Sequence, residues 1–280
     1  MRIEVKNLTH IYSSGMPFET VALHDVSFTV ESGEFAALIG HTGSGKSTLA
    51  EHIIGLLKPN SGEVLFDGVD IASSRELRKK VGMVFQYPEY QLFEEDVISD
   101  VCYGPKNLGF SEEEAKAKAF DALRLVGLDP EVFGAKSPFA LSGGEKRRVA
   151  IAGVLAMEPS VLILDEPTAG LDPAGRNDIL ALIKKIKEER EITIFLVSHD
   201  MDAVANMADH VLVMDSGALV LEGSPAQVFA QGPMLRSIGL ELPSAARLIE
   251  KLRARGLDIP GSASAFTADD AAKLILEAWQ

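Results

Sequence analysis

Short apolar runs alternate with helical stretches along the chain, and their order predicts an α/β fold. Two apolar runs, Val21–Val30 and Glu34–Ile39, lead into a glycine-rich turn at Gly40–Gly45 and then into a helix. Farther along, Val161–Leu164 and Ile192–Val197 are continuously apolar, which is typical of parallel strands buried on both faces. We therefore expect a mostly parallel sheet with helices on both of its faces.

Further strands are predicted on either side of these runs. Residues 1–6 alternate apolar with charged side chains, and Gly62–Gly68 and Val81–Gln86 have strand-like patterns. Val211–Met214 and Ala218–Leu221 flank an Asp-Ser-Gly turn, so they should form a hairpin.

Helical patterns fill the rest of the chain. From residue 88 to 159 the pattern is helical, with Ser111 as an expected N-cap and Glu114 as its capping-box partner. Pro173–Arg190 has its apolar residues on one side and follows Asp172, a suitable helix cap. The tail adds two helical patterns, residues 243–255 and 267–280, separated by residues 256–264.

Composition places the chain among soluble globular proteins. Of its 280 residues 46% are hydrophobic and 24% are charged, and no apolar run reaches the roughly 18 to 20 residues of a membrane-spanning helix. The N-terminus lacks the apolar stretch of a signal peptide, and one cysteine, Cys102, permits no internal disulfide. A net charge of −14 favours solubility and weighs against nucleic-acid partners, which require a basic surface. We expect a cytoplasmic protein.

One loop predicts nucleotide chemistry. The pattern G-x-x-x-x-G-K-[ST] is filled by Gly40, His41, Thr42, Gly43, Ser44, Gly45, Lys46 and Ser47. Glycines let successive N–H groups point at phosphates, the lysine adds a cation, and the Ser47 hydroxyl suits Mg²⁺. Thr48, in the same helix start, completes the predicted ATP site. A glycine-rich surface turn is the plainer alternative, and the loop by itself indicates only a P-loop NTPase.

A carboxylate pair follows one of the buried strands. Asp165 should lie at the rim of the site, where it would hold Mg²⁺, and Glu166 would polarise the attacking water. An ordinary strand-end pair capping the next element is the alternative, which its position downstream of the P-loop disfavours.

The stretch Leu141-Ser142-Gly143-Gly144-Glu145 resembles the signature sequence of the ABC ATPase family. The resemblance implies that Ser142, Gly143, Gly144 and Glu145 bind the γ-phosphate of ATP held by a second subunit. The same residues form a capping box for a helix, and both interpretations hold together. The family usually has glutamine where Glu145 stands. This carboxylate either repels the phosphate or caps its own helix, and we favour the cap.

Other segments match the family in its own order over about residues 2 to 232. The resemblance implies that Tyr12 stacks on adenine, with a buried core tyrosine as the alternative. It also implies that Gln86, ending a strand, contacts Mg²⁺ and water. Residues 169–172 would form the D-loop, and His199 would be the switch histidine that hydrogen-bonds the γ-phosphate.

The implied architecture is a P-loop NTPase core with an N-terminal antiparallel β part. Residues 1–232 would form the nucleotide-binding domain, with a helical subdomain at about 88–158. Residues 233–280 would be a helical extension that helps hold two ATPases together; a pair of domain-capping helices is the alternative. Two subunits would sandwich ATP head to tail, with Glu166 as base. The mate is either a copy or a paralogue.

Two stretches, residues 84–93 and 103–109, resemble the ATPases of energy-coupling factor (ECF) transporters, which import vitamins or cobalt and nickel ions. The resemblance implies a place on the cytoplasmic face of the cell membrane, bound to a membrane T component and indirectly to a substrate-binding S component. Near Gln86–Asp96 the groove for the T component would carry Glu89, Glu94, Glu95 and Asp96. Such carboxylates suit an arginine-bearing helix, although a solvated acidic face is the alternative.

Three other functions are weighed against this one. An ATPase of another ABC transporter class would differ in the membrane proteins that it accompanies. Soluble ABC ATPases that act on DNA or ribosomes usually carry a long coiled coil or two cassettes, and this chain shows neither. A small-molecule kinase would have no purpose for the signature at Ser142.

Overall fold

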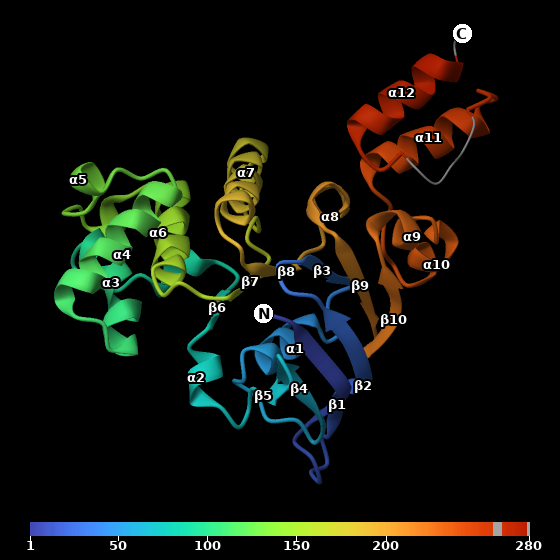
Figure 1. Cartoon of the computed structure of the whole chain (residues 1–280). Helices are drawn as coiled ribbons and strands as arrows, with labels where there is room; N and C mark the ends of the chain where they lie inside the picture. Colours follow the sequence, from blue (N-terminus) through green and yellow to red (C-terminus); the bar gives the residue numbers. More distant parts are fainter. Residues whose placement is uncertain (260–264, 279–280) are drawn as a thin grey trace.

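The computed structural model describes residues 1–259 and 265–278. A six-stranded sheet runs through its centre (Figure 1). From edge to edge the strands are β10 (Ala218–Gly223), β9 (His210–Asp215), β3 (Phe35–Gly40), β8 (Thr193–Val197), β7 (Val161–Asp165) and β6 (Val81–Val84). Neighbours from β9 to β6 pair in parallel, and β9 pairs antiparallel with β10. The predicted parallel sheet and hairpin are confirmed.

Side chains of the central strands alternate between two cores. On β8, Ile194 and Leu196 pack in the cluster that includes helix α7 (Pro173–Glu189). Phe195 and Val197 pack on the other face, with helix α1 (Lys46–Ile53) and the N-terminal strands. Figure 1 shows α7 and α8 (Met201–Met207) on one side of the sheet and α1 on the other, which confirms helices on both faces.

A second sheet forms the N-terminal antiparallel part. Its order is β2 (Thr20–Val30), β1 (Ile3–Tyr12), β4 (Ser61–Phe66) and β5 (Val69–Asp70). The single strand predicted over residues 62–68 is wrong at its end, because Asp67 (φ 49°) and Gly68 (φ 82°) form a turn. Two consecutive positive φ angles make the tight hairpin turn that an Asp-Gly pair favours.

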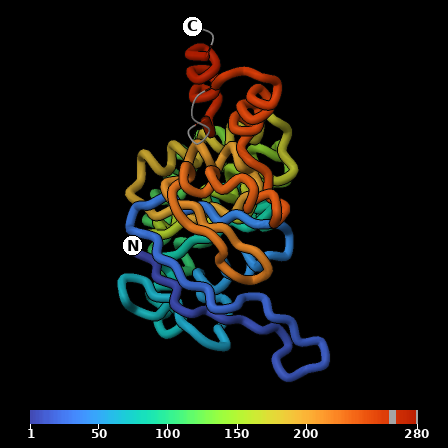
Figure 2. The backbone as a smooth tube through the Cα atoms, turned by 90° about the vertical axis from the view of Figure 1, so that its right-hand side faces the viewer, coloured from blue at the N-terminus to red at the C-terminus, as the bar shows by residue number. Residues whose placement is uncertain are grey.

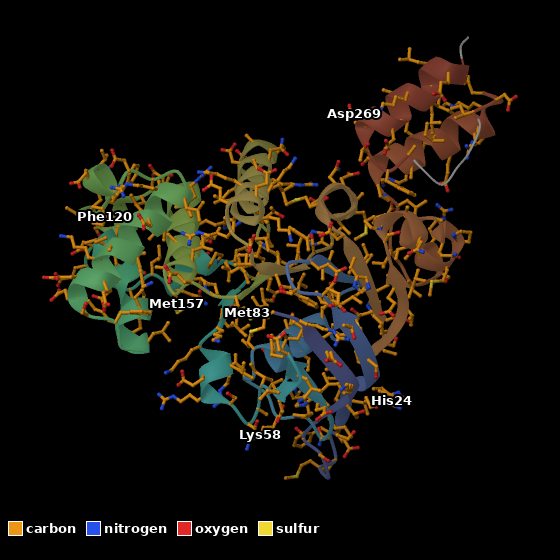
Figure 3. All side chains as sticks on the ribbon, viewed as in Figure 1. His24, Lys58, Met83, Phe120, Met157 and Asp269 are labelled. Carbon is orange, nitrogen blue, oxygen red and sulfur yellow. The ribbon has the colours of Figure 1, made fainter. Side chains whose placement is uncertain are left out.

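Residues 88–155 form a helical region on the side of β6. Two 3₁₀ turns, η1 (Pro88–Gln91) and η2 (Pro138–Ala140), accompany α3 (Val97–Leu108), α4 (Glu112–Leu125), α5 (Pro130–Phe133) and α6 (Gly143–Leu155), and a short α2 (Arg75–Arg78) precedes β6. The predicted capping box is confirmed, since Ser111 N–H donates to Glu114 Oε2 at 2.8 Å and Glu114 N–H donates to Ser111 Oγ. Figure 3 shows Phe120 on the side of this region away from the sheet and Met157 on the side toward it.

The C-terminal part consists of α9 (Pro225–Phe229), α10 (Gly232–Ser237), α11 (Ser244–Ala254) and α12 (Ala268–Ala278). Helices α11 and α12 confirm the two helices predicted for the tail, and they pack together at the end opposite the N-terminal sheet (Figure 1, Figure 2). Residues 260–264 and 279–280 of those patterns lie outside the described residues. Because α10 crosses residue 232 and its Leu235 packs in the same cluster as Val211 and Val213, the division at that residue stays a prediction.

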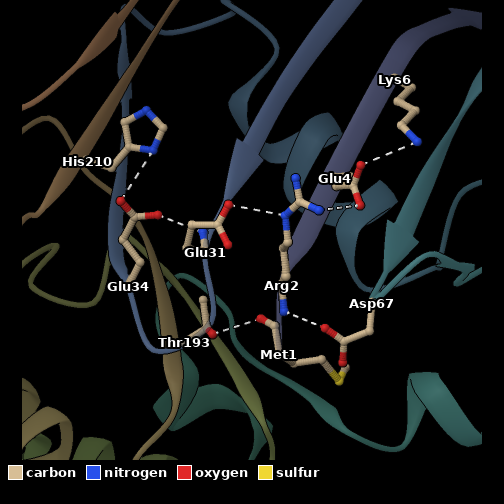
Figure 4. A network of polar contacts seen from close by, with 9 residues as sticks. All are labelled: Met1, Arg2, Glu4, Lys6, Glu31, Glu34, Asp67, Thr193 and His210. Carbon is tan, nitrogen blue, oxygen red and sulfur yellow. Dashed lines mark hydrogen bonds and ion pairs between the residues drawn. The ribbon is translucent and has the colours of Figure 1, made fainter.

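A polar network joins the two sheets at the chain start (Figure 4). Arg2 bonds to Glu31 (3.2 Å), and Glu31 N–H donates to Glu34 Oε2 (2.8 Å), whose other oxygen lies 3.8 Å from His210 Nδ1. Thr193 Oγ1 donates to the carbonyl oxygen of Met1 (3.0 Å). The first strand is thereby fixed to β8 and β9. No helix in residues 1–259 and 265–278 has the length and apolar character to cross a membrane.

Candidate nucleotide site

The phosphate-binding motif lies on a strand–loop–helix unit, as predicted. Strand β3 ends at Gly40, the loop turns through Gly43 (φ 84°) and Gly45 (φ 100°), and α1 begins at Lys46. A Cβ at Gly45 would lie 2.7 Å from the carbonyl oxygen of Ala22, so both the backbone angle and the space require glycine. The loop therefore opens directly onto a helix N-terminus, where backbone N–H groups and the helix dipole favour an anion.

Lys46 and His41 hold the loop in its shape. Lys46 Nζ donates to the carbonyl oxygens of Gly40 (2.8 Å) and His41 (2.9 Å). His41 Nε2 lies 2.8 Å from Asp215 Oδ1 and so ties the loop to the end of β9. Burial lowers the pKa of Lys46, while the two acidic side chains at the end of β7 oppose that shift. The lysine is thus a cation already facing two carboxylates.

The acidic pair lies where the sequence predicted it, at the carboxyl end of β7. Asp165 is the last residue of that strand, and Glu166 follows with a left-handed backbone (φ 49°). Burial and the neighbouring Glu166 charge raise the pKa of Asp165, and Lys46 and a hydrogen bond from Ser47 act against this. A non-glycine residue at positive φ costs of the order of 1 kcal/mol or more, and such strain is commonly held at functional sites.

His199 reaches the carboxylate of Glu166 from the end of β8. His199 Nδ1 lies 2.6 Å from Glu166 Oε2, within ion-pair distance although without hydrogen-bond geometry. The imidazole is 74% exposed and the Glu166 side chain is 14% exposed. An exposed imidazole therefore touches a sheltered carboxylate.

These groups line one cleft of about 520 Å³. The predicted residues on its wall are Tyr12, Thr42, Gly43, Gly45, Lys46, Ser47, Thr48, Gln86, Asp165, Glu166 and His199. Gly40, His41 and Ser44 belong to the loop but do not line the cleft, and Ser44 is fully buried. Thr20, Val21 and Ala22 of β2 also line it, and sequence reasoning missed them because they lie there through pairing with β1.

Tyr12 stands at the edge of this cleft. Its side chain is 40% exposed, which excludes the buried core tyrosine. The hydroxyl lies 3.3 Å from Thr48 Oγ1, and His10 packs edge-on with 4.5 Å between ring centroids. An aromatic face held in this way suits stacking on a planar base.

The signature residues lie away from the cleft, at the start of α6. Glu145 Oε2 accepts from Ser142 N–H (2.8 Å) and from Ser142 Oγ (2.7 Å), which completes a capping box. These bonds lower the pKa of Glu145. The favoured interpretation of Glu145 as a cap is confirmed, and one chain does not bring Ser142, Gly143, Gly144 and Glu145 to its own phosphate loop.

The segment after β6 corrects part of the acidic-groove prediction. Strand β6 ends at Val84, so Gln86 lies exposed just beyond the strand rather than ending it. Glu89 does not face outward: its carboxylate accepts two bonds from Arg147, at 2.9 and 3.1 Å. Asp96 caps α3 through Ser99 N–H (2.8 Å). Arg147 and the start of α3 thus use these two carboxylates, which leaves Glu95, which is exposed, and Glu94, which is half-buried, for an outside partner.

Arg147 itself is a residue that the sequence did not single out. An arginine in a helix is usually a surface residue, yet this one is only 1% exposed.

Farther on, Asp172 caps α7 through Gly175 N–H (2.7 Å), as predicted, so residues 169–172 lead directly from Glu166 into that helix.

Comparisons with known proteins agree with this geometry. A family profile described as ABC transporter matches residues 23–169. The energy-coupling factor transporter ATP-binding protein EcfA2 of Clostridium perfringens (strain 13 / Type A) is 54% identical over 99% of this chain and 98% of its own length. The protein of that name in Clostridioides difficile (strain 630) is 52% identical over 99% of this chain and 97% of its own.

Solved structures extend the likeness to three dimensions. The structure of cbiO1 from Clostridium perfringens, part of the ABC transporter complex cbiONQ, matches with a TM-score of 0.75 and 43% identity over 89% of this chain and 98% of that one. A dimeric ATP-binding cassette in a post-hydrolysis state, bound to ADP and Pi, matches with a TM-score of 0.70 and 31% identity over 80% of this chain and 98% of that one.

Proposed function

This chain belongs to the ABC transporter ATPases, in the branch of the energy-coupling factor transporter ATP-binding proteins, and from this premise we propose how its residues use ATP. It is an ATP-binding and ATP-hydrolysing subunit of such a transporter. One observation supports the assignment of its site most strongly: a single cleft gathers the phosphate loop, the acidic pair, Gln86, His199 and Tyr12 from five separate strands or their ends.

ATP would lie along this cleft with its base on Tyr12 and its phosphates on the loop. Backbone N–H groups of residues 43–48 and the ammonium of Lys46 would bind the β- and γ-phosphates. Because Lys46 already bonds to two carbonyl oxygens of its own loop, it would exchange these bonds for phosphate oxygens without changing its place.

Hydrolysis requires a water molecule in line with the γ-phosphate and a group that takes its proton. Glu166 would be this group, since it follows β7 directly and its half-buried carboxylate lies beside His199. His199 would hydrogen-bond the γ-phosphate once it leaves Glu166. Gln86, which also lines the cleft, would orient the water. Catalysis then rests on positioning and charge stabilisation.

The residues beside the loop fit Mg²⁺. Ser47 hydroxyl, Asp165 carboxylate and Gln86 amide are hard oxygen donors, and all three line the same cleft. A bound Mg²⁺ would supply positive charge to the phosphate oxygens. A cation there would also relieve the repulsion between Asp165 and Glu166 that raises the pKa of Asp165.

The second subunit would complete the site. Ser142, Gly143 and Gly144 stand at a helix start away from their own cleft, which supports a role toward a nucleotide held by another chain. The similar cassette bound to ADP and Pi is a dimer. We infer a head-to-tail pair in which each signature faces the other subunit's γ-phosphate.

The membrane T component would dock on the surface after Gln86. Exposed aromatic side chains gather there, with Tyr87 near Tyr90 (6.1 Å between ring centroids) and Phe93 edge-on to Tyr103 (4.8 Å). With Glu94 and Glu95 beside them, this docking surface suits an arginine-bearing helix, because guanidinium groups stack on aromatic rings and pair with carboxylates. The chain would thus act at the cytoplasmic face of the membrane, and an S component would bind the vitamin or metal ion.

The Glu166→Gln variant tests the chemistry. It should bind ATP with an affinity close to that of the unaltered chain and lower kcat by about a hundredfold or more, because only the base is removed. ATP binding and phosphate release measured on the same preparation separate the two effects. Near-normal hydrolysis by this variant would refute the assigned base.

A further inference from the structure

Arg147 connects three segments that the proposed function uses. From helix α6, its Nε and Nη2 donate to the two oxygens of Glu89 (3.1 and 2.9 Å). Its Nη1 donates to the carbonyl oxygens of Pro167 and Ala169, each at 3.0 Å. The guanidinium therefore bonds at once to the segment after Gln86 and to the loop after Glu166.

Stability alone does not explain a charged pair at this place. Arg147 is 1% exposed and Glu89 18%, so both charges lose hydration, and buried ion pairs often contribute no more than apolar side chains of similar size. What a paired guanidinium provides instead is fixed geometry, since its planar fork meets a carboxylate with two parallel bonds. The same guanidinium that pairs with Glu89 also bonds the two carbonyl groups.

The two carbonyl groups belong to the turn that shapes the catalytic carboxylate. Pro167 follows Glu166 directly, and Ala169 N–H donates to the carbonyl oxygen of Glu166 (3.0 Å). Glu166 has a positive φ, a strained state that persists only when its surroundings fix it. Two hydrogen bonds from Arg147 reach the turn that follows it.

Glu89 lies at the other end of this connection, among the aromatic residues of the docking surface. It belongs to η1, between Tyr87 and Tyr90. Tyr87 also approaches the loop, because a Cβ at Gly170 would lie 3.2 Å from the Tyr87 ring. The docking surface therefore approaches the loop after Glu166 at two points, through Arg147 and where Tyr87 lies beside Gly170.

We propose that Arg147 is a positioning residue that holds Glu166 in place and transmits to it the position of the docking surface. The proposal rests on the proposed function. When the membrane partner shifts the segment that carries Glu89, the guanidinium moves with it, and the loop that shapes Glu166 follows. ATP binding, which uses the P-loop, does not depend on this connection.

The test compares Glu89→Gln and Arg147→Lys with the control Arg148→Lys, each in the full chain assembled with its second ATPase subunit and membrane partner. Arg148 neighbours Arg147 on α6 but donates to the carbonyl oxygen of Val126 (2.8 Å) within the helical region. Hydrolysis is measured with and without the membrane partner, and melting temperature is recorded for every variant.

Both test variants should lower kcat about tenfold with KM for ATP within about twofold, and should lose the change in rate that the membrane partner produces. Since the two residues form one connection, the double variant should be no slower than the slower single variant. Rates and partner response equal to those of Arg148→Lys, or single effects that multiply, would overturn the proposal. If Arg147→Lys does not fold, Glu89→Gln decides alone. An unaltered complex that hydrolyses no ATP would refute the proposed function instead.

Discussion

Replacing Glu145 by glutamine should strengthen the ATP-driven closure of the subunit pair. In the structure the Ser142 hydroxyl donates to Glu145 Oε2 at 2.7 Å, and the backbone N–H of Ser142 donates to the same oxygen at 2.8 Å. To bind a γ-phosphate on the other subunit, the hydroxyl must leave this carboxylate. Glutamine keeps the capping box but offers a neutral acceptor.

The size of the effect follows from the bond that is lost. A hydrogen bond to a charged group contributes about 1.5–3 kcal/mol and a neutral one about 0.5–1.5 kcal/mol. Because Glu145 is partly exposed, solvent reduces the difference. We take about 0.7 kcal/mol, which corresponds to roughly a threefold change in an equilibrium constant.

The assay measures the ATP concentration that gives half-maximal association of the two subunits, in a Glu166→Gln background so that ATP is not consumed. Glu145→Gln should lower that concentration about threefold. The control is Glu114→Gln, since Glu114 closes the same kind of capping box on α4 with Ser111, at 2.8 Å for both bonds. It should cost similar stability and leave the ATP dependence unchanged.

An unchanged or higher ATP requirement in Glu145→Gln would refute this reasoning. It would mean that the Ser142 hydroxyl does not leave its carboxylate when the dimer closes, or that the hydroxyl contributes nothing to binding.

Two further predictions concern acid stability and docking. Burial and neighbouring His10 lower the pKa of His52 from 6.5 to about 4, so between these values the unfolded chain binds a proton that the folded chain excludes, and stability falls as the pH falls. Urea unfolding should show that the free energy of unfolding falls by about 2 kcal/mol between pH 7 and 5. The variant His52→Leu should remove this loss, and the control His24→Leu, at an exposed histidine, should retain it. Equal pH dependence in the two variants would show that His52 is not the cause. The double variant Glu94→Lys, Glu95→Lys should release the membrane partner, measured by co-purification, while its affinity for ATP, measured by nucleotide titration, stays within about twofold. Unchanged assembly would show that these carboxylates do not face the membrane partner.

Contiguous chemistry was predictable from the sequence. The P-loop needs its glycines, lysine and serine side by side, and Asp165-Glu166 needs only the buried strand before it, so these features appear as short patterns. The capping boxes at Ser111 and Ser142 also involve residues three apart. Their geometry is local, and the structure reproduces it.

Contacts between distant segments were not predictable. Arg147 and Glu89 are 58 positions apart, and each by itself looks like a surface charge. For that reason the sequence predicted four carboxylates in the acidic groove, although Glu89 pairs with Arg147 and Asp96 caps α3. Thr20–Ala22 line the cleft only because β2 pairs with β1. The turn at Asp67-Gly68 is different: it is local, and the Asp-Gly pair is the signal that could have predicted it.

Capture of the tagged, otherwise unaltered chain from its native membrane tests the central claim most directly. Its identified partners should include a second ABC ATPase and at least one membrane-spanning protein, and adding ATP to the captured complex should release phosphate. Recovery of the chain with ribosomes or DNA, or without any membrane protein, would contradict a transporter ATPase that works through the docking surface after Gln86.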